Sequence, residues 1–258
     1  MAQILSRRDG AVATALISNP AKHNAMGPEM WQSLAEVLDD FERDPAVFVI
    51  VLAGDGGKAF VSGADISKFG DGGPASKNET GDQAQMPYMA PLRCTKPVVA
   101  KIRGICMGGG LGLAAACDIR ICSDDAVFRM PAGRLGLGYA YEGISRYVDL
   151  IGPANTLDIF FSARKFDAAE ALRMGFVMRV VPAAQLDAEV AGYCALIADN
   201  APLTLRAAKQ AVLTSLRGGD AGQKARLQAL ISQCAASADF KEGKTAFMEK
   251  RKPIFKGA

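Results

Sequence analysis

The sequence predicts a mixed α/β domain followed by a helical C-terminal segment. Residues 47–54 form a continuous apolar run that is typical of a buried strand, and residues 97–104 and 118–123 are further predicted strands. Between the last two, residues 105–118 pass from an apolar run through three glycines into a small-residue stretch typical of a helix. Strand patterns fade after about residue 150. We therefore expect an α/β core over 1–195 and a helical segment over 196–258.

The earlier elements follow from their periodicity. Residues 11–18 alternate small and large apolar side chains, which predicts a strand. Residues 28–44 place Met30, Leu34, Leu38 and Phe41 on one helical face, and Pro28 suits the first turn. The polar, glycine-rich stretch 67–85 predicts a long loop of the kind that often forms a functional lid.

The later elements are mainly helical. Residues 152–163 and 201–219 are typical of helices, as is the tail. A further helix is expected to start at Asp167, because Glu170 lies at capping-box spacing and Gly175 provides a stop.

Composition excludes several classes of protein. The formal net charge of +3 is too small to indicate a nucleic-acid partner, and the basic residues gather only in the tail, 241–258. That tail is expected to be either a solvated helix or a seat for a phosphate-bearing ligand. The N-terminus carries charge where an export signal needs apolar residues, and no apolar run approaches membrane-spanning length. These features predict a cytoplasmic protein that does not bind membranes.

Cysteine and histidine usage narrows the chemistry. The six cysteines form no CxxC pair and lie mostly among apolar residues, so we expect reduced thiols in the core. His23 is the single histidine, and no G-x-S-x-G nucleophile elbow is present. A catalytic triad, a zinc site and a disulfide framework are therefore all disfavoured, and no metal is expected.

The glycine motif within 105–118 allows two interpretations. Residues 110–115 fit the G-x-G-x-x-A fingerprint of dinucleotide-binding folds, but several strands precede them, and Asp124 and Asp125 come too early to bind a ribose. The alternative is that free N–H groups at the helix N-terminus stabilise a developing oxyanion. A second glycine-containing turn, at 57–69, could supply the other donor. The oxyanion interpretation is favoured. The dinucleotide interpretation, which would make the protein a nicotinamide dehydrogenase, is kept as an alternative.

Several segments in fixed order resemble the crotonase (enoyl-CoA hydratase/isomerase) superfamily. They are NPAKHNAM (19–26), AFVSGADI (59–66), KPVVAKIRGICMGGGLGLAAACDIRIC (96–122), FSARKFDAAEALRMGFVMRVVP (161–182) and FMEKRKPIFKG (247–257). The resemblance covers nearly the whole chain. It implies a spiral of repeated ββα turns, with a C-terminal helical segment that forms a trimer or a dimer of trimers.

The resemblance also implies site residues. The N–H groups of Ala64 and Gly109 would hold the thioester oxygen of an acyl-CoA substrate, next to Gly108. The path of coenzyme A would be lined by Lys22, Asn24, Ala25, Asp65 and Ile66. Coenzyme A is part of the substrate, so no separate cofactor is expected. Lysines of the tail would approach coenzyme A, in the same subunit or a neighbouring one. The Asp65 carboxylate could instead cap a helix, and Lys22 could be plain surface.

This chain departs from the family at two positions. Family hydratases carry two glutamates, which here are replaced by Gly112 and Ala132, and neither of these can transfer a proton. Glu142 is the first candidate to replace them, although an acidic residue in a first helical turn also stabilises the helix dipole. Tyr139 is the second candidate. Arg134 and Tyr141 are nearby polar residues expected at the surface or an interface.

Three functions remain compatible with these residues, besides the dehydrogenase. The first is a hydratase/isomerase-type enzyme in which Glu142 moves the proton. The second is a decarboxylase or other lyase, because loss of CO₂ generates an enolate directly and needs the oxyanion donors more than a base. The third is a silent acyl-CoA-binding protein.

Overall fold

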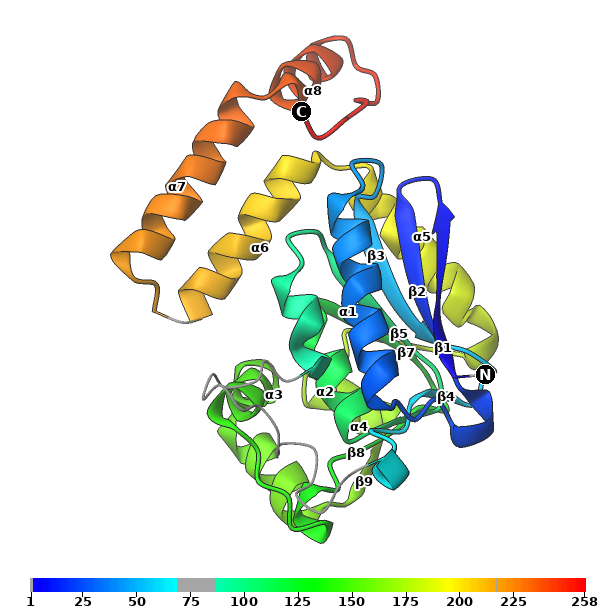
Figure 1. Ribbon diagram of the computed structural model, residues 1–258. Coiled ribbons are helices and arrows are strands. Elements are labelled where there is room, and N and C mark those ends of the chain that lie inside the picture. The colour runs from blue at the N-terminus through cyan, green and yellow to red at the C-terminus, as the bar shows by residue number, and fades with distance from the viewer. Residues whose placement is uncertain (1, 69–86, 217) are drawn as a thin grey trace.

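The computed structural model describes residues 2–68, 87–216 and 218–258, and within them the chain forms two sheets (Figure 1). The larger sheet contains, in spatial order, β1 (Gln3–Asp9), β2 (Val12–Ser18), β3 (Val49–Gly54), β5 (Val98–Ile102), β7 (Ile119–Ser123) and β10 (Arg179–Val181). The smaller sheet contains β4 (Ala59–Val61), β6 (Ile105–Met107), β8 (Val127–Arg129) and β9 (Lys165–Asp167). All neighbouring strands are parallel except β1 with β2 and β8 with β9.

Successive strands alternate between the two sheets. The pairs β3 and β4, β5 and β6, and β7 and β8 each give one strand to the larger sheet and the next to the smaller. Gly104, between β5 and β6, has φ of +60°, and a Cβ there would lie 2.1 Å from the Lys58 carbonyl oxygen, so only glycine fits this turn. The predicted spiral of ββα turns is confirmed.

Eight α-helices complete the described chain. They are α1 (Pro28–Arg43), α2 (Gly109–Ala116), α3 (Tyr141–Ser162), α4 (Ala168–Arg173), α5 (Leu186–Ala198), α6 (Pro202–Leu216), α7 (Ala221–Ala236) and α8 (Ala238–Met248). The described 3-10 segments are η1 (Pro20–Lys22), η2 (Ile66–Lys68), η3 (Pro87–Arg93), η4 (Ala132–Arg134) and η5 (Ala183–Gln185). Helices α1 and α5 lie on opposite faces of the larger sheet (Figure 1).

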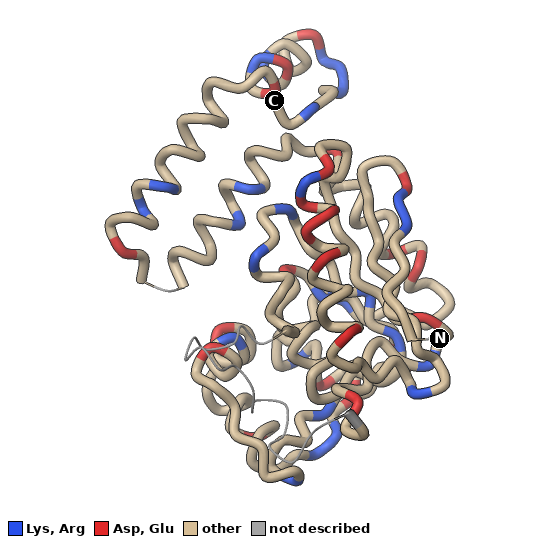
Figure 2. The backbone as a smooth tube through the Cα atoms, viewed as in Figure 1, with Lys and Arg blue, Asp and Glu red and all other residues tan. Residues whose placement is uncertain are grey.

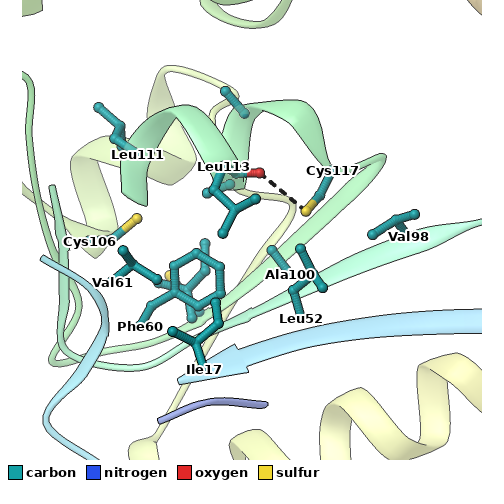
Figure 3. Close-up of a cluster of buried hydrophobic side chains, with 14 of the residues drawn as sticks. Ile17, Leu52, Phe60, Val61, Val98, Ala100, Cys106, Leu111, Leu113 and Cys117 are labelled. Carbon is teal, nitrogen blue, oxygen red and sulfur yellow. Dashed lines mark hydrogen bonds between the residues drawn. The ribbon is translucent and has the colours of Figure 1, made fainter. Parts of the chain in front are cut away.

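The alternation of strand side chains explains why both faces are covered. Ile50 and Leu52 of β3 point into the main core, which also holds Leu34 and Leu38 of α1. Val49 and Val51 of the same strand join a second cluster with residues of α5. Figure 3 shows the main core between the sheets and α2, where the Cys117 thiol donates to the Leu113 carbonyl at 3.3 Å. The apolar run of β3 is continuous because both faces of this strand are buried.

Most sequence-predicted elements are confirmed. The strands expected at 11–18, 47–54, 97–104 and 118–123 correspond to β2, β3, β5 and β7, and the helix expected at 28–44 is α1. Asp167 caps α4 by accepting a hydrogen bond from the Glu170 N–H at 2.8 Å. Apart from Ser67 and Lys68 in η2, the loop predicted at 67–85 lies outside the described residues.

Four strands escaped the sequence analysis. β1 is largely exposed and charged, so it lacks the expected alternation, and pairing with β2 through the turn at Gly10 holds it in place. β8, β9 and β10 are only three residues long, and pairing with neighbouring strands specifies them. β9 and β10 lie beyond residue 150, where the strand pattern of the sequence fades.

The last three helices project from the body. Helices α6 and α7 run side by side, and α8 packs at the far end, where the C-terminus also lies (Figure 1). Lys209 anchors α6 to the body by donating to the Asp118 carboxylate at 2.7 Å and to the Lys96 carbonyl at 3.0 Å. The boundary expected at 195/196 falls inside α5, which packs on the larger sheet.

Charge and thiols are distributed as the composition suggested. Residues of both charges occur along the described chain, with acidic residues gathered on α1 (Figure 2). All six cysteines are free thiols, and five are buried, with Cys234 half-buried. Burial raises the pKa of Cys117 to about 12, so this thiol stays protonated and unreactive.

In the part of the chain that the structure describes, no helix has the length and apolar character needed to cross a bilayer.

Candidate active site

The first donor group is the N–H of Ala64, which the backbone geometry leaves free. Ala64 forms a parallel bridge with Met26, whose N–H donates to the Gly63 carbonyl and whose carbonyl accepts from the Asp65 N–H, both at 2.9 Å. In this arrangement the neighbours of Ala64 make the bonds, and its own N–H points to the opposite side. Among the described residues it has no acceptor.

The second donor group is the N–H of Gly109, the first residue of α2. The preceding Gly108 has φ of +52° and ψ of −119°, a conformation that lets the chain turn from β6 directly into the helix. As a first-turn donor, the Gly109 N–H has no partner within the helix, and none elsewhere in the described chain.

The two donors lie side by side. An ideal Cβ built on Gly109 would be 3.6 Å from the Ala64 nitrogen and 3.3 Å from Cζ2 of Trp31, the only tryptophan in the chain. Two unpaired N–H groups from different segments, with a helix N-terminus behind one of them, are an arrangement that can hold a negatively charged oxygen. The structure therefore brings together Ala64 and Gly109 as the sequence predicted.

The opposite end of α2 is held by two buried arginines. Arg120 donates to the Cys117 carbonyl at 2.7 Å and to the Ala114 carbonyl at 3.3 Å, and Arg146 donates to the Ala115 carbonyl at 2.7 Å. Burial, with the neighbouring Arg146 charge, lowers the pKa of Arg120 to about 10, so it remains cationic at neutral pH. These cations satisfy the last carbonyls of α2 and stabilise its dipole, whose positive end faces the donor pair.

The two positions at which the resemblance predicts family glutamates lie next to the donors. Gly112 is one turn along α2 from Gly109, and the ring of Tyr88 covers it, because a Cβ at Gly112 would lie 2.7 Å from the ring. Ala132 is buried in η4, directly after Pro131, whose ring approaches Gly108. Neither position brings a titratable side chain to the donors.

The two acid–base candidates differ in burial and in packing. Tyr139 is half-buried, with its ring centroid 6.4 Å from that of Tyr88 and 5.3 Å from that of Phe160, and burial raises its pKa. Glu142 is exposed in the first turn of α3, where it complements the helix dipole. Arg134 and Tyr141 are exposed, as expected for surface residues.

The predicted coenzyme A segments are neighbours in space. Lys22 forms a 2.8 Å ion pair with Asp65, and the Ser62 hydroxyl donates to the Lys22 carbonyl at 3.2 Å, which joins the 19–26 turn to the 62–66 segment. Ala25 and exposed Ile66 flank this junction. The Lys22 ammonium and the Ser67 hydroxyl lower the pKa of Asp65 to about 2. Because Asp65 also accepts from the Ser67 N–H at 3.2 Å, its helix-capping interpretation is confirmed.

Asn24 has a structural role in the same turn. It is fully buried with φ of +58°, and its amide donates to the Asp55 carbonyl at 2.9 Å and to the Ala59 carbonyl at 2.8 Å. Its side-chain oxygen accepts from the Asn19 N–H at 2.9 Å. All of these bonds hold the turn against β4, so Asn24 contributes by shaping the predicted coenzyme A path.

Three residues around the site were missed in the sequence. Tyr88 of η3 and Trp31 of α1 lie beside Gly112 and Gly109, whereas Arg120 of β7 acts on the far end of α2. Trp31 follows the apolar face of α1 and Arg120 interrupts an apolar strand, so both look like ordinary element residues. Only a buried charge within the 118–123 strand could have indicated that Arg120 has a specific role. Within the described residues, no group of three or more His, Cys, Asp or Glu side chains could hold a metal ion.

The ββα spiral defines the class of protein, a crotonase-fold protein. Comparison with known proteins agrees, because the sequence profile of the family described as "Enoyl-CoA hydratase/isomerase" matches residues 7–258. The chain belongs to the enoyl-CoA hydratase/isomerase family, and it is an enzyme of the hydratase/isomerase type.

Individual relatives match along their whole length. A short-chain-enoyl-CoA hydratase of Clostridium acetobutylicum is 31% identical over 249 residues, which cover 96% of this chain and 95% of the relative. A crotonyl-CoA hydratase of Syntrophomonas wolfei is 31% identical over 253 residues, which cover 98% and 97%. The crystal structure of an enoyl-CoA hydratase from Bacillus anthracis superposes with a TM-score of 0.87 at 27% identity and covers 99% of both chains.

Proposed function

We propose that this enzyme binds an acyl-CoA thioester and stabilises its enolate, with the N–H groups of Ala64 and Gly109 on the thioester oxygen. The observation that carries the proposal is the pair of adjacent, unpaired N–H groups at the N-terminus of α2. Fixed donors of this kind need no reorganisation when charge develops, and each is worth about 10²–10³ in rate. The two cations at the far end of α2 add to the favourable field.

The substrate's coenzyme A is proposed to follow the junction of the 19–26 turn and the 62–66 segment. Lys22, Ala25, Asp65 and Ile66 line it, Asn24 shapes it, and Gly108 leads into the donor pair. Coenzyme A enters as part of the substrate, and the proposal requires no further cofactor. Lysines of the tail are proposed to contact it from the same or a neighbouring subunit.

The proton step is proposed to depend on Glu142, with Tyr139 as the alternative. The named activities of the Clostridium acetobutylicum and Syntrophomonas wolfei relatives support hydration of a short-chain enoyl-CoA. Hydration requires a base to activate water, and Gly112 and Ala132 leave this task to another group. Because burial raises the pKa of Tyr139, its phenol is protonated at neutral pH and can donate but not accept a proton.

Decarboxylation is the second candidate, because it avoids the need for a base. The carbon–carbon bond to a substrate carboxylate would break, its electrons would form the enolate, CO₂ would leave, and the α carbon would take a proton from water or Tyr139. The donor pair stabilises this enolate as well as it stabilises one formed by hydration chemistry. The apolar environment created by Gly112, Ala132 and the Tyr88 ring favours this reaction.

Replacing Gly109 tests the donor pair directly. Proline is tolerated at a first helical position and removes the N–H, whereas alanine adds a similar Cβ and keeps the N–H. With acetoacetyl-CoA as ligand, wild type and Gly109→Ala should both produce the ultraviolet band of the bound enolate. Gly109→Pro, with its folding checked by circular dichroism, should lose that band and about 10²-fold or more of the turnover. A Gly109→Pro enzyme that keeps both would refute the proposal.

A substrate panel separates the reactions. Hydration of crotonyl-CoA without CO₂ release supports the hydratase, whereas CO₂ release from malonyl- or methylmalonyl-CoA without hydration supports the lyase. Tight thioester binding with no turnover across the panel would identify a silent binding protein. A melting temperature raised by NAD but not by acetoacetyl-CoA would instead indicate the dehydrogenase.

A further inference from the structure

The space beside Gly112 is filled by an aromatic ring. A Cβ at this position would lie 2.7 Å from Cδ2, 3.0 Å from Cε2 and 3.1 Å from Cγ of Tyr88. Such distances are well inside van der Waals contact, so residue 112 can carry a side chain only if the ring moves away. Gly112 and Tyr88 are therefore a matched pair.

The ring is fixed in this place by its surroundings. Tyr88 belongs to η3, whose Ala90 and Pro91 are buried and which packs against both α1 and α2. The centroid of the Tyr88 ring lies 6.4 Å from that of Tyr139, and the Tyr139 ring packs edge-to-face against Phe160. Moving the Tyr88 ring would disturb this row of aromatic side chains, so the ring is a stable wall.

This wall lies within one helical turn of the oxyanion donor. Gly109 and Gly112 are three residues apart on α2, so they share a face and are about 4.5 Å apart along the axis. The α carbon of a bound thioester is bonded to the carbon that bears the oxygen at Gly109. The acyl chain beyond it must pass this face, which Trp31 covers at Gly109 and Tyr88 covers at Gly112.

We propose that the ring of Tyr88, seated on Gly112, closes the acyl site after the first carbons and restricts this enzyme to short acyl groups. The inference rests on the proposed function, because it takes the acyl group to lie beside Gly109. It concerns the choice of acyl group, and it holds whether the reaction is a hydration or a decarboxylation.

Saturated acyl-CoA esters test the inference without turnover. Trp31 is the only tryptophan and lies against Gly109, so its fluorescence reports ligands at the donor pair. We expect wild type to bind butyryl-CoA about tenfold or more tighter than octanoyl-CoA. Tyr88→Ala should remove most of that preference by strengthening octanoyl-CoA binding. Tyr88→Phe, which retains the ring, should keep the preference.

The outcomes distinguish this inference from the proposed function. An unchanged preference in Tyr88→Ala, or a wild type that binds both esters equally, would overturn the role of Tyr88 while leaving the thioester site intact. If neither ester perturbed Trp31 or raised the melting temperature of the wild type, the proposed function itself would fail.

A double-mutant cycle tests the contact itself. Gly112→Ala should lower the melting temperature in the wild type, because the new methyl group meets the ring, but not in the Tyr88→Ala background. The matched control is Gly192→Ala in α5, where nothing lies within 4 Å and alanine should raise the melting temperature slightly. Equal losses from Gly112→Ala in both backgrounds would show that the ring is not the obstacle.

Discussion

At the scale of the residue, the groups expected to do most of the chemistry belong to the backbone. The donors at Ala64 and Gly109 depend on conformation, and the glycines beside them make that conformation possible, with φ of +123° at Gly63 and +52° at Gly108. A side chain at either glycine would be strained. Ordinary side-chain substitutions at Ala64 or Gly109 therefore say little about catalysis, and tests must remove the N–H.

Glu142 offers a test of the acid–base assignment. If its carboxylate moves the proton, Glu142→Gln should reduce hydration or isomerisation more than tenfold, in keeping with the about 10²–10⁴ that such groups contribute. Folding should be unaffected, because the side chain is exposed. Steady-state kinetics with crotonyl-CoA provide the measurement, and Arg134→Gln on the neighbouring surface is the control. An unchanged rate would exclude Glu142 as the base and would favour a reaction without a base, in which Tyr139 can donate the proton.

The Lys22–Asp65 pair predicts a small pH dependence of stability. The pKa of Asp65 is lowered to about 2, below its usual value of about 3.9 in an unfolded chain. The stabilisation is therefore complete above pH 4 and is lost as the pH falls through about 2. Urea denaturation from pH 6 to pH 3 should show Asp65→Asn less stable than wild type, with a gap that begins to narrow below pH 4. A gap that widened with acidification would contradict this sign.

At the scale of the element, α2 joins the core to the site. It spans Gly109–Ala116 only, and every residue after the first is buried. Its N-terminus supplies a donor, and its C-terminal carbonyls bond to Arg120 and Arg146. A short helix has little intrinsic stability, so packing and these end contacts hold it in place.

Removing Arg120 should therefore loosen α2. Arg120→Met keeps much of the volume but removes the side-chain donor to the Phe176 carbonyl and one of the donors to each of the Ala114 and Cys117 carbonyls. We expect a loss of about 2 kcal/mol or more in the free energy of unfolding, measured by urea denaturation, and a weaker enolate band with acetoacetyl-CoA. Exposed Arg134→Met should change stability by less than about 0.5 kcal/mol. Equal effects of the two substitutions would exclude a special role for the buried arginine.

At the scale of the whole molecule, the C-terminal helices expose apolar surface. Phe247 and Met248 at the end of α8 are 82% and 75% exposed, and Val212 of α6 and Ile231 of α7 are also exposed. Exposed large apolar side chains on a projecting segment favour an interaction surface there. Assembly through 196–258 into a trimer or a dimer of trimers stays a prediction.

Light scattering coupled to size exclusion tests this assembly. Wild type should have the mass of three or six chains, and the double variant Phe247→Asp with Met248→Asp should shift toward smaller species. Ser6→Asp, on the exposed strand β1, is the control and should leave the mass unchanged. A wild type that is monomeric at all concentrations would rule out the predicted oligomer.

The sequence by itself determined the elements whose patterns are local. The apolar face of α1, the strands β2, β3, β5 and β7, and the Asp167 cap follow from periodicity and capping chemistry within a few residues. The glycine run at 108–110 likewise predicted a helix N-terminus with free donors. β1, β8, β9 and β10 escaped prediction because partner strands specify them, and their own side chains carry little pattern.

Only the tertiary structure decided what surrounds the donors. The sequence showed that residue 112 is a glycine where a glutamate was expected, but not that Tyr88, 24 positions earlier, occupies the space beside it. Nor could it place Trp31 against Gly109, or Arg120 at the end of α2. Contacts between distant segments arise from packing a whole core at crystal-like density, and no local pattern in the chain encodes which side chain will fill a given space.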